Sequence, residues 1–424
     1  MKGRAIIPEG PIEVLLVDGD NRAGLAVSRS LARHGVSFLL ITGDAQGIAS
    51  CSRSVKHSML APCRPAKGDE YVEFLVETIR RHGIQLAIPV TDQALRLFER
   101  YRSVLAAETR LAMANSQAVR SVLDKRINLE VAKRVGVPCP REFELQDPAQ
   151  IPEMIQMLGV PVVLKNPGDS PEANGAGFKF RVLYAHSEEE VRSHIEKHCA
   201  NGKYPLFQEC AVGTVHNLCC FAAQGELIAV HEYHSVRRNE GVGVLRKIVA
   251  PLPDLVEHAS QLLRALDWDG VAHVAFFIGH DGQKKWYMET NGRFWASTEG
   301  SVHAGWDFPY WVYRYFRHGE KPVPEEIKLG SMTCWHCGDL LALLDYFRGG
   351  PPPATGTSPG KVRATLQYLS GFAPGIHSDV FHWNDPMPGL VENWKMIAKS
   401  WQFMRGKAAQ PVATVPAKGG VPRG

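Results

Sequence analysis

The sequence lacks several features that would assign it to other protein classes. Its 424 residues contain no apolar run long enough to cross a bilayer, so no stable membrane insertion is expected. The N-terminus lacks the apolar core of a signal peptide. The formal net charge is only +4, too mild a basic excess to indicate nucleic acid as a partner. These absences predict a cytoplasmic protein.

The nine cysteines are an odd number and are scattered along the chain. Cys334 and Cys337 form one Cys-x-x-Cys pair, and no second pair has matching spacing, so a four-cysteine zinc site is not indicated. Reduced cysteines in the cytoplasm are the favoured interpretation. Metal binding or redox chemistry at this one pair stays open.

Three motifs of common enzyme classes are also absent. The sequence has no Gly-x-x-x-x-Gly-Lys-[Ser/Thr] loop, no Gly-x-Gly-x-x-Gly dinucleotide fingerprint, and no convincing Ser-His-Asp or Cys-His set. A chain of this length is expected to form two or three domains with large cores.

The N-terminal part alternates apolar runs with a helical pattern. Residues 12–17 form a buried-strand pattern, a glycine turn and a helix follow, and residues 36–41 form a second strand pattern. Residues 85–92 form a further strand that ends in polar residues. This order predicts a parallel sheet and an α/β fold.

The most informative stretch is residues 287–295, which follows an apolar strand pattern at 271–277 and a turn around Gly282. Residues two apart on a strand share a face, so Glu289, Asn291 and Arg293 are expected to point the same way. Carboxylate and amide oxygens suit Mg²⁺, and a guanidinium suits a phosphoryl oxygen. A solvated strand end is the weaker alternative, because the flanking residues are apolar and isolated polar groups among them are costly.

A second polar feature ends another strand. Residues 160–165 are an apolar run that closes on Lys165, and a loop containing Gly168, Gly175 and Gly177 leads to Lys179. Glycine lets backbone N–H groups approach phosphate oxygens closely. The two lysines are therefore candidate phosphate ligands, although a loop between strands is common and is weak evidence alone.

Glu-x-Asn-x-Arg-Phe-Trp after a hairpin resembles the metal-binding signature of ATP-grasp ligases, and the carbamoyl-phosphate-synthase-like and predicted ATP-dependent carboligase branches are the most similar. The resemblance implies a Rossmann-like pre-ATP-grasp domain, then an α+β ATP-grasp module, then a C-terminal helical extension. The implied bounds are 12–118, 119–320 (subdomains 119–205 and 206–320) and 321–407. Residues 408–424 are expected to be a disordered tail.

The same resemblance implies roles for further residues. Gln208, Glu209 and Val212 lie in a segment similar to the family's adenine hinge, and Lys125, at the start of a helix before Gly-Val-Pro-x-Pro, is expected near the nucleotide. Arg246 is the candidate for the acyl-phosphate and acceptor side. An ordinary buried strand and a plain capped surface helix remain the structural alternatives for the hinge pair and for Lys125.

The sequence departs from the family pattern at two places. The second metal ligand of many members corresponds to Ala275, so one or two Mg²⁺ ions remain open, and His273 is not expected in register with the signature. The usual ribose-binding acid is missing, and His216 or Asn217 are candidate substitutes.

The resemblance implies an ATP-dependent carboxylate–amine ligase. Glu289 and Asn291 would hold Mg²⁺, Lys165 and Lys179 the phosphates, and Arg293 the transferring group, with ADP and phosphate released as a small-molecule carboxylate becomes an acyl phosphate for attack by a nucleophile. A nucleotide-binding protein without catalysis is the alternative, and a homodimer is left open.

The C-terminal helical stripe includes Leu390, Trp394 and Ile397. Docking of this stripe onto the protein's own core is the favoured expectation, and contact with a membrane surface is the weaker one.

Overall fold

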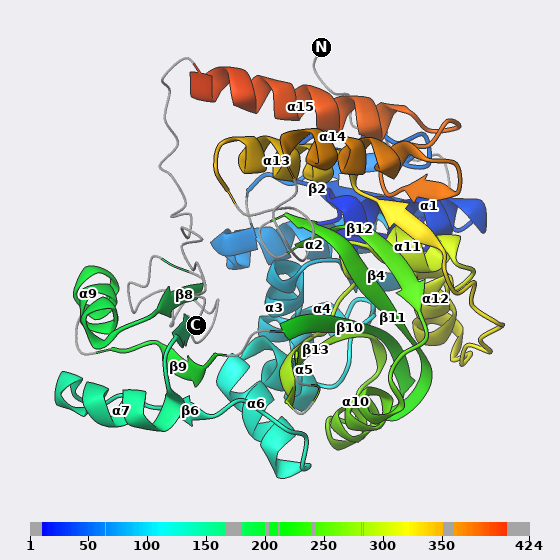
Figure 1. Cartoon of the computed structure of the whole chain (residues 1–424). Coiled ribbons are helices and arrows are strands. Elements are labelled where there is room, and N and C mark those ends of the chain that lie inside the picture. The colour runs from blue at the N-terminus through cyan, green and yellow to red at the C-terminus, as the bar shows by residue number, and fades with distance from the viewer. Residues whose placement is uncertain are drawn as a thin grey trace. The chain divides into compact units, whose positions relative to one another are not determined.

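The computed structural model describes residues 11–63, 65–165, 180, 182–199, 203–210, 213–239, 242–280, 282, 284–350 and 360–404 (Figure 1). Two compact units make up the chain. The first combines residues 1–112, 231–250 and 294–424, and the second combines residues 113–230 and 251–293. Each unit is therefore assembled from segments that are distant in the sequence. The predicted domain layout, with bounds at 118, 205 and 320, stays a prediction.

The first unit contains a parallel five-stranded sheet in the order β3-β2-β1-β4-β5. Every residue of β1 (Val14–Val17), β2 (Phe38–Thr42) and β4 (Leu86–Pro89) is buried, as is usual for parallel strands covered on both faces. The other strands and the helices of this part are β3 (His57–Leu60), β5 (Arg110–Leu111), α1 (Arg22–Arg33), α2 (Asp69–His82), α3 (Asp92–Arg100), α4 (Arg102–Ala106) and the 3₁₀ turn Pro65–Lys67. The predicted α/β class with a parallel sheet is confirmed.

The turn from β1 into α1 depends on glycine. Asn21 caps the helix, its side chain accepting a hydrogen bond from the Gly24 amide at 3.0 Å. A Cβ on Gly24 would lie 1.8 Å from the carbonyl oxygen of Gly19, so only glycine lets the helix start this close to the turn.

The rest of the first unit comes from the middle and the end of the chain. Strands β12 (Val242–Val249), β15 (Met332–Cys334) and β16 (Ile376–Ser378) are neighbours in one sheet, and part of β11 (Glu226–Asn239) belongs here too. The helices are α11 (Thr298–His303), α12 (Phe308–His318), α13 (His336–Phe347), α14 (Lys361–Leu369), α15 (Met387–Met404) and the 3₁₀ turn Ser370–Phe372. Residues 321–407, which were predicted as a helical extension, contain α13, α14 and α15 and also the two short strands β15 and β16.

Helices α13, α14 and α15 lie together in Figure 1. The expected docking of the α15 stripe is wrong for its described side chains, because Leu390, Trp394 and Ile397 are 54%, 71% and 46% exposed. The helix instead turns Pro388 and Gly389 inward. Gly389 lies so near Phe381 that a Cβ there would approach the Phe381 side chain to 2.8 Å. The tail expected at 408–424 lies outside the described residues.

Two buried ion pairs tie distant segments of the first unit together. Arg237 on β11 pairs with Asp339 on α13, and both Asp339 oxygens accept from the Arg237 Nε, at 2.9 and 3.1 Å. Arg246 on β12 pairs with Asp379, whose carboxylate also lies 3.6 Å from Arg22. All five side chains are largely buried, so these charges depend on one another for compensation.

The second unit contains a small antiparallel sheet in the order β6-β9-β7-β8. Its strands and helices are β6 (Glu142–Phe143), β7 (Val162–Lys165), β8 (Val182–Ala185), β9 (Leu206–Glu209), α7 (Ile151–Leu158), α9 (Glu188–His198) and the 3₁₀ turn Pro148–Gln150. Leu158, Val162, Leu164 and Phe207 belong to one apolar cluster between the sheet and its helices. The cluster fixes the strand that ends in Lys165.

The other part of the second unit is an antiparallel ladder of long strands. Strand β13 (Gly270–Gly279) pairs with β10 (Gly213–Ala223) on one side and with β14 (Lys285–Asn291) on the other. Helices α5 (Ser116–Leu123), α6 (Lys125–Arg134) and α10 (Pro253–Ala265) pack here, with α5 and α6 against β14 and α10 against β10. The predicted hairpin around Gly282 is therefore confirmed.

No helix among the described residues is both long and apolar enough to cross a membrane.

Candidate functional site

The β13–β14 hairpin brings four side chains to one face. Its register places His273 opposite Asn291 and Ala275 opposite Glu289. Directly opposite residues in an antiparallel pair project to the same side of the sheet. The expectation that His273 lies out of register is therefore wrong, because a bulge between Ala275 and Phe276 shifts the pairing that a simple count along the sequence would give.

The bulge also changes the pattern within β14. Tyr287 and Thr290 are buried, three residues apart, while Glu289 and Asn291 are only partly buried. The Tyr287 hydroxyl donates to Thr290 at 2.7 Å, and its amide donates to the Pro138 carbonyl at 2.7 Å. These contacts anchor the strand from behind and leave the acid and the amide on its other face.

Strand β14 ends at Asn291, so the expected alternation does not extend to Arg293. After Asn291 the backbone leaves the strand direction at Gly292. A Cβ on Gly292 would lie 2.4 Å from the ring of the buried Trp268, so glycine is what makes this bend possible. Arg293 still belongs to the same cluster, since its charge lowers the pKa of His273. Arg293 therefore reaches the cluster because the backbone at Gly292 passes close to Trp268, and not by strand geometry alone.

His273 is the residue that the sequence interpretation missed. It is 8% exposed. Its Nδ1 lies 3.4 Å from the Asn291 amide nitrogen, which also donates to Glu289 Oε1 at 3.1 Å. Burial, and then the Arg293 charge, lower the pKa of His273 to about 4, although Glu289 opposes this. The imidazole is therefore neutral at neutral pH and orients the Asn291 amide. The strand register was the signal that could have identified His273 as a residue of this site.

Lys165 belongs to the same charged group. Burial lowers its pKa, and Glu289 provides the strongest opposing electrostatic influence. Lys125 lowers the pKa further, and Glu142 raises it. Lys125 is the first residue of α6, where the Asp124 side chain accepts from the Arg126 amide at 2.9 Å and caps the helix. Lys125 and Glu289, which come from separate elements, are therefore both near the Lys165 ammonium.

Strand β9 carries the candidate hinge residues and pairs with β7, where Gln208 lies opposite Val163 and Glu209 opposite Val162. Gln208 is buried and donates to Glu142 at 2.8 Å. Glu209 accepts from the Arg141 amide at 2.7 Å and from its guanidinium at 2.9 and 3.0 Å. Both side chains thus fix the end of the strand. Lys179 and Val212 lie outside the described residues.

Asn217 on β10 lies directly opposite Ala275. By the same reasoning it faces the side on which Glu289 and Asn291 lie, and it is 8% exposed. The small Ala275 side chain separates it from Glu289. His216 points to the other face, and its Nε2 lies 3.0 Å from the Thr214 hydroxyl.

Arg246, the predicted acceptor-side residue, lies in the first unit. Its Nη1 donates to the Gly243 carbonyl at 2.8 Å, and its Nη2 pairs with Asp379. Within the described part of the chain, its buried Nε has no hydrogen-bond partner.

The Cys334–Cys337 pair is reduced: all nine cysteines are free. Burial raises the pKa of each of these two thiols to about 12. A redox-active pair needs an accessible thiolate, so this pair is structural.

The donor set on the hairpin fits a hard cation. Glu289 supplies a carboxylate, and a half-rotation of the Asn291 amide would present its oxygen beside it. Lys165 and Arg293 are the positive groups that a phosphate would need near such an ion.

Comparisons with known proteins bear on the fold of the chain. No protein-family profile matches the chain. The N5-carboxyaminoimidazole ribonucleotide synthase of Synechococcus elongatus is 26% identical over 194 residues, which are 44% of this chain and 46% of that protein. The chain thus matches about half the length of this curated relative.

Two solved structures are similar over a longer stretch. N5-carboxyaminoimidazole synthetase from Staphylococcus aureus has a TM-score of 0.60 at 12% identity, covering 86% of this chain and 98% of that one. The chain has the fold of the ATP-grasp superfamily. The biotin carboxylase domain of Hydrogenobacter thermophilus 2-oxoglutarate carboxylase, solved as a dimer with MgADP and bicarbonate, has a TM-score of 0.60 at 17% identity, covering 76% of this chain and 74% of that one. The predicted resemblance to ATP-grasp ligases is therefore confirmed at the level of the fold.

Proposed function

We propose that this protein is an ATP-grasp ligase that uses Mg-ATP to convert a carboxylate into an acyl phosphate, which an amine or similar nucleophile then attacks. The observation that carries this proposal is the cluster in the second unit, where Lys125 and Glu289 are both near Lys165, Asn291 donates a hydrogen bond to Glu289, and Arg293 and Glu289 are both near His273.

Each residue has a role that follows from its chemistry. Glu289 and Asn291 would hold Mg²⁺, which when bound neutralises charge on phosphate oxygens. Lys165 and Lys125 would position the phosphates of ATP, and Arg293 would stabilise negative charge on the transferring group. With the Asn291 amide rotated so that its oxygen faces the ion, neutral His273 would carry its proton on Nδ1 and donate to that oxygen, without adding a positive charge that competes with the ion.

The adenine would lie along the chain segment that follows β9. The Gln208 and Glu209 side chains bond to Glu142 and Arg141, so backbone groups and Val212 would read the base. Lys179 would contribute a further phosphate contact. We propose Asn217 as the polar group that replaces the ligand missing at Ala275, because it shares the face of Glu289 and has the oxygen that a cation requires.

Arg246 would serve the acceptor side in the first unit. The Nε that has no partner among the described residues supports this assignment, because a buried guanidinium N–H is costly unless a ligand accepts from it. The finer layout of a pre-ATP-grasp domain, a two-part grasp module and an extension belongs to this proposal, as do the cytoplasmic location and the homodimer.

The test is a screen of carboxylic acids, with bicarbonate included, in the presence of Mg-ATP and hydroxylamine. An acyl phosphate is trapped as its hydroxamate, and chromatography resolves the nucleotides. ADP should appear in step with hydroxamate. The cations of the cluster would stabilise charge at the terminal phosphates of ATP, so attack at the γ-phosphorus with ADP as leaving group is expected. For bicarbonate, whose hydroxamate is not expected to accumulate, bicarbonate-dependent ADP release is the readout.

The outcomes separate the mechanisms. AMP and pyrophosphate formed in step with product would replace acyl phosphorylation with adenylation. ATP binding without acid-dependent turnover across the whole screen would support the non-catalytic alternative.

A further inference from the structure

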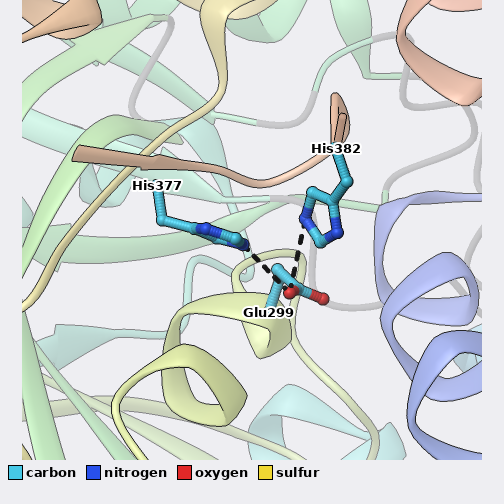
Figure 2. A group of neighbouring side chains, drawn as sticks. All are labelled: Glu299, His377 and His382. Atoms are coloured by element: carbon cyan, nitrogen blue, oxygen red, sulfur yellow. Dashed lines mark hydrogen bonds and ion pairs between the residues drawn. The ribbon is translucent and has the colours of Figure 1, made fainter. Parts of the chain in front are cut away.

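A second polar cluster lies in the first unit, built from three segments. Glu299 is the second residue of α11, His377 lies in the middle of β16, and His382 lies in the turn between β16 and α15. Figure 2 shows both imidazole rings directed at the Glu299 carboxylate. Their Nε2 atoms lie 3.2 and 3.5 Å from the same oxygen, Oε1.

These distances fit a tetrahedral metal centre. Zn²⁺ bonds of about 2.0–2.1 Å in a tetrahedron place the donor atoms about 3.3 Å apart. One donor atom from each of the three side chains lies within 4.8 Å of the other two. Two histidines and one glutamate form a ligand set of known catalytic zinc centres, in which the fourth position takes water or substrate.

The Glu299 carboxylate needs a further partner. It is 4% exposed, and its Oε2 has no hydrogen-bond partner among the described residues. A buried carboxylate oxygen left in this way is costly unless it is paired or coordinates a cation. The two histidine contacts both fall on Oε1, so they leave this oxygen unsatisfied.

The segment that carries the histidines is held in place before any ion binds. At one end Asp379 pairs with buried Arg246. At the other end Asp385 accepts from the Arg29 Nε at 3.0 Å and from the Ser52 hydroxyl at 2.6 Å. Rigid support of this kind is what a preorganised metal site requires.

Around the rings the packing is equally defined. The exposed His303 ring stacks on His377 with centroids 4.1 Å apart and planes at 9°. His382 Nε2 also lies 3.1 Å from the Ser378 carbonyl, which accepts a hydrogen bond from this nitrogen when the nitrogen carries the ring proton. Coordination requires the Nε2 lone pair, so both rings would carry their proton on Nδ1 when an ion is bound.

We propose that Glu299, His377 and His382 form a binding site for Zn²⁺ or a similar first-row transition cation. This site uses nitrogen and carboxylate ligands and is distinct in composition from the Glu289–Asn291 pair, whose oxygen donors suit Mg²⁺. His377 and His382 are partly exposed, which leaves the ion a path from solvent.

The experiment is a titration of the 424-residue, chelator-treated chain with Co²⁺ under reducing conditions. Co²⁺ replaces Zn²⁺ in tetrahedral sites and reports its ligands by visible absorption. We expect one saturable equivalent with tetrahedral bands and without thiolate charge-transfer bands. Glu299→Gln and His377→Ala should each weaken binding by at least about tenfold, by analogy with the loss on removing outer-shell partners.

Two control variants test the location. His303→Ala removes a neighbouring ring that supplies no ligand, and Glu289→Gln removes the carboxylate of the Mg²⁺ cluster. Both should retain the Co²⁺ equivalent. Equal binding by Glu299→Gln, His377→Ala and the unaltered protein would overturn the proposal.

A readout on the unaltered protein covers the case in which a variant does not fold. Zn²⁺ should shift the ring nitrogen resonances of two histidines, assigned to His377 and His382. A metal-free spectrum that Zn²⁺ leaves unchanged would mean that the three side chains are only hydrogen-bonded, and the proposal would fail.

Discussion

Replacing Glu289 by Gln tests the proposed metal pair separately from the stability of the fold. The change keeps the shape of the side chain and removes one negative charge from a cluster that also contains Lys165, His273 and Arg293. The Gln oxygen can still accept the 3.1 Å hydrogen bond from Asn291. The loss of stability is therefore that of a weakened charged hydrogen bond, about 1 kcal/mol, and the melting temperature should fall by no more than about 2–4 °C.

The effect on turnover should be much larger. Removing one preorganised electrostatic group from an active site costs about 2.7–4 kcal/mol, or a factor of roughly 10²–10³ in kcat. The Mg²⁺ concentration needed for half-maximal rate should rise as well, because the pair loses its charged ligand. Lys165 loses the carboxylate that most strongly supports its charged form, so its pKa should fall further.

The assay follows ADP release against Mg²⁺ concentration for the unaltered enzyme and the variant, with thermal unfolding measured on the same samples. Glu226→Gln is the matched control, since it makes the same chemical change at an exposed position on β11. Normal turnover and normal Mg²⁺ dependence in Glu289→Gln would refute the assignment of the metal pair. A large drop in melting temperature would show that Glu289 is mainly structural.

Three further outcomes are expected. Gly292→Ala should destabilise the protein by about 1–3 kcal/mol in chemical denaturation, because the alanine Cβ would lie 2.4 Å from the Trp268 ring. Unchanged stability would show that the backbone at this position can move. Arg237→Leu should lower the free energy of unfolding by about 3–5 kcal/mol, because Asp339 stays buried without its counter-charge. Adding Asp339→Leu should recover most of this loss. A double variant as unstable as the single variant would contradict the reasoning. Because burial raises the pKa of Cys337 to about 12, alkylation of this thiol in the native protein should stay slow between about pH 7 and 9. The extent of alkylation is measured by mass spectrometry, and a rate as fast as in the unfolded chain would disprove the prediction.

Local patterns were enough to predict the parts of the fold that depend on neighbouring residues. The β1–α1–β2 opening follows from apolar runs around a glycine turn, and Gly24 explains why the turn is tight. The β13–β14 hairpin follows from alternation and from Gly282, whose φ is positive. Lys165 at a strand end and Glu289 with Asn291 on a hairpin were likewise readable, because each is set by local geometry.

Register, by contrast, required the three-dimensional structure. A bulge of one residue decides which side chains face each other, and it brings His273 to Asn291. Composition gives no sign of such a bulge. The end of β14 at Asn291 has a similar cause, since contact of Gly292 with the distant Trp268 sets it.

Long-range pairing was also beyond the sequence. Glu299 and His377 are 78 positions apart, and Arg246 and Asp379 are 133 apart, so no local spacing could reveal either contact. The apolar stripe of α15 shows a related limit. Its periodicity predicts a helix, but it does not predict which face of that helix other segments cover. The sequence by itself determined the strands, the turns and the spacing of the Glu-x-Asn-x-Arg motif through short-range sterics and alternation. Only the tertiary structure decided which distant charges meet, because that depends on how the segments pack together.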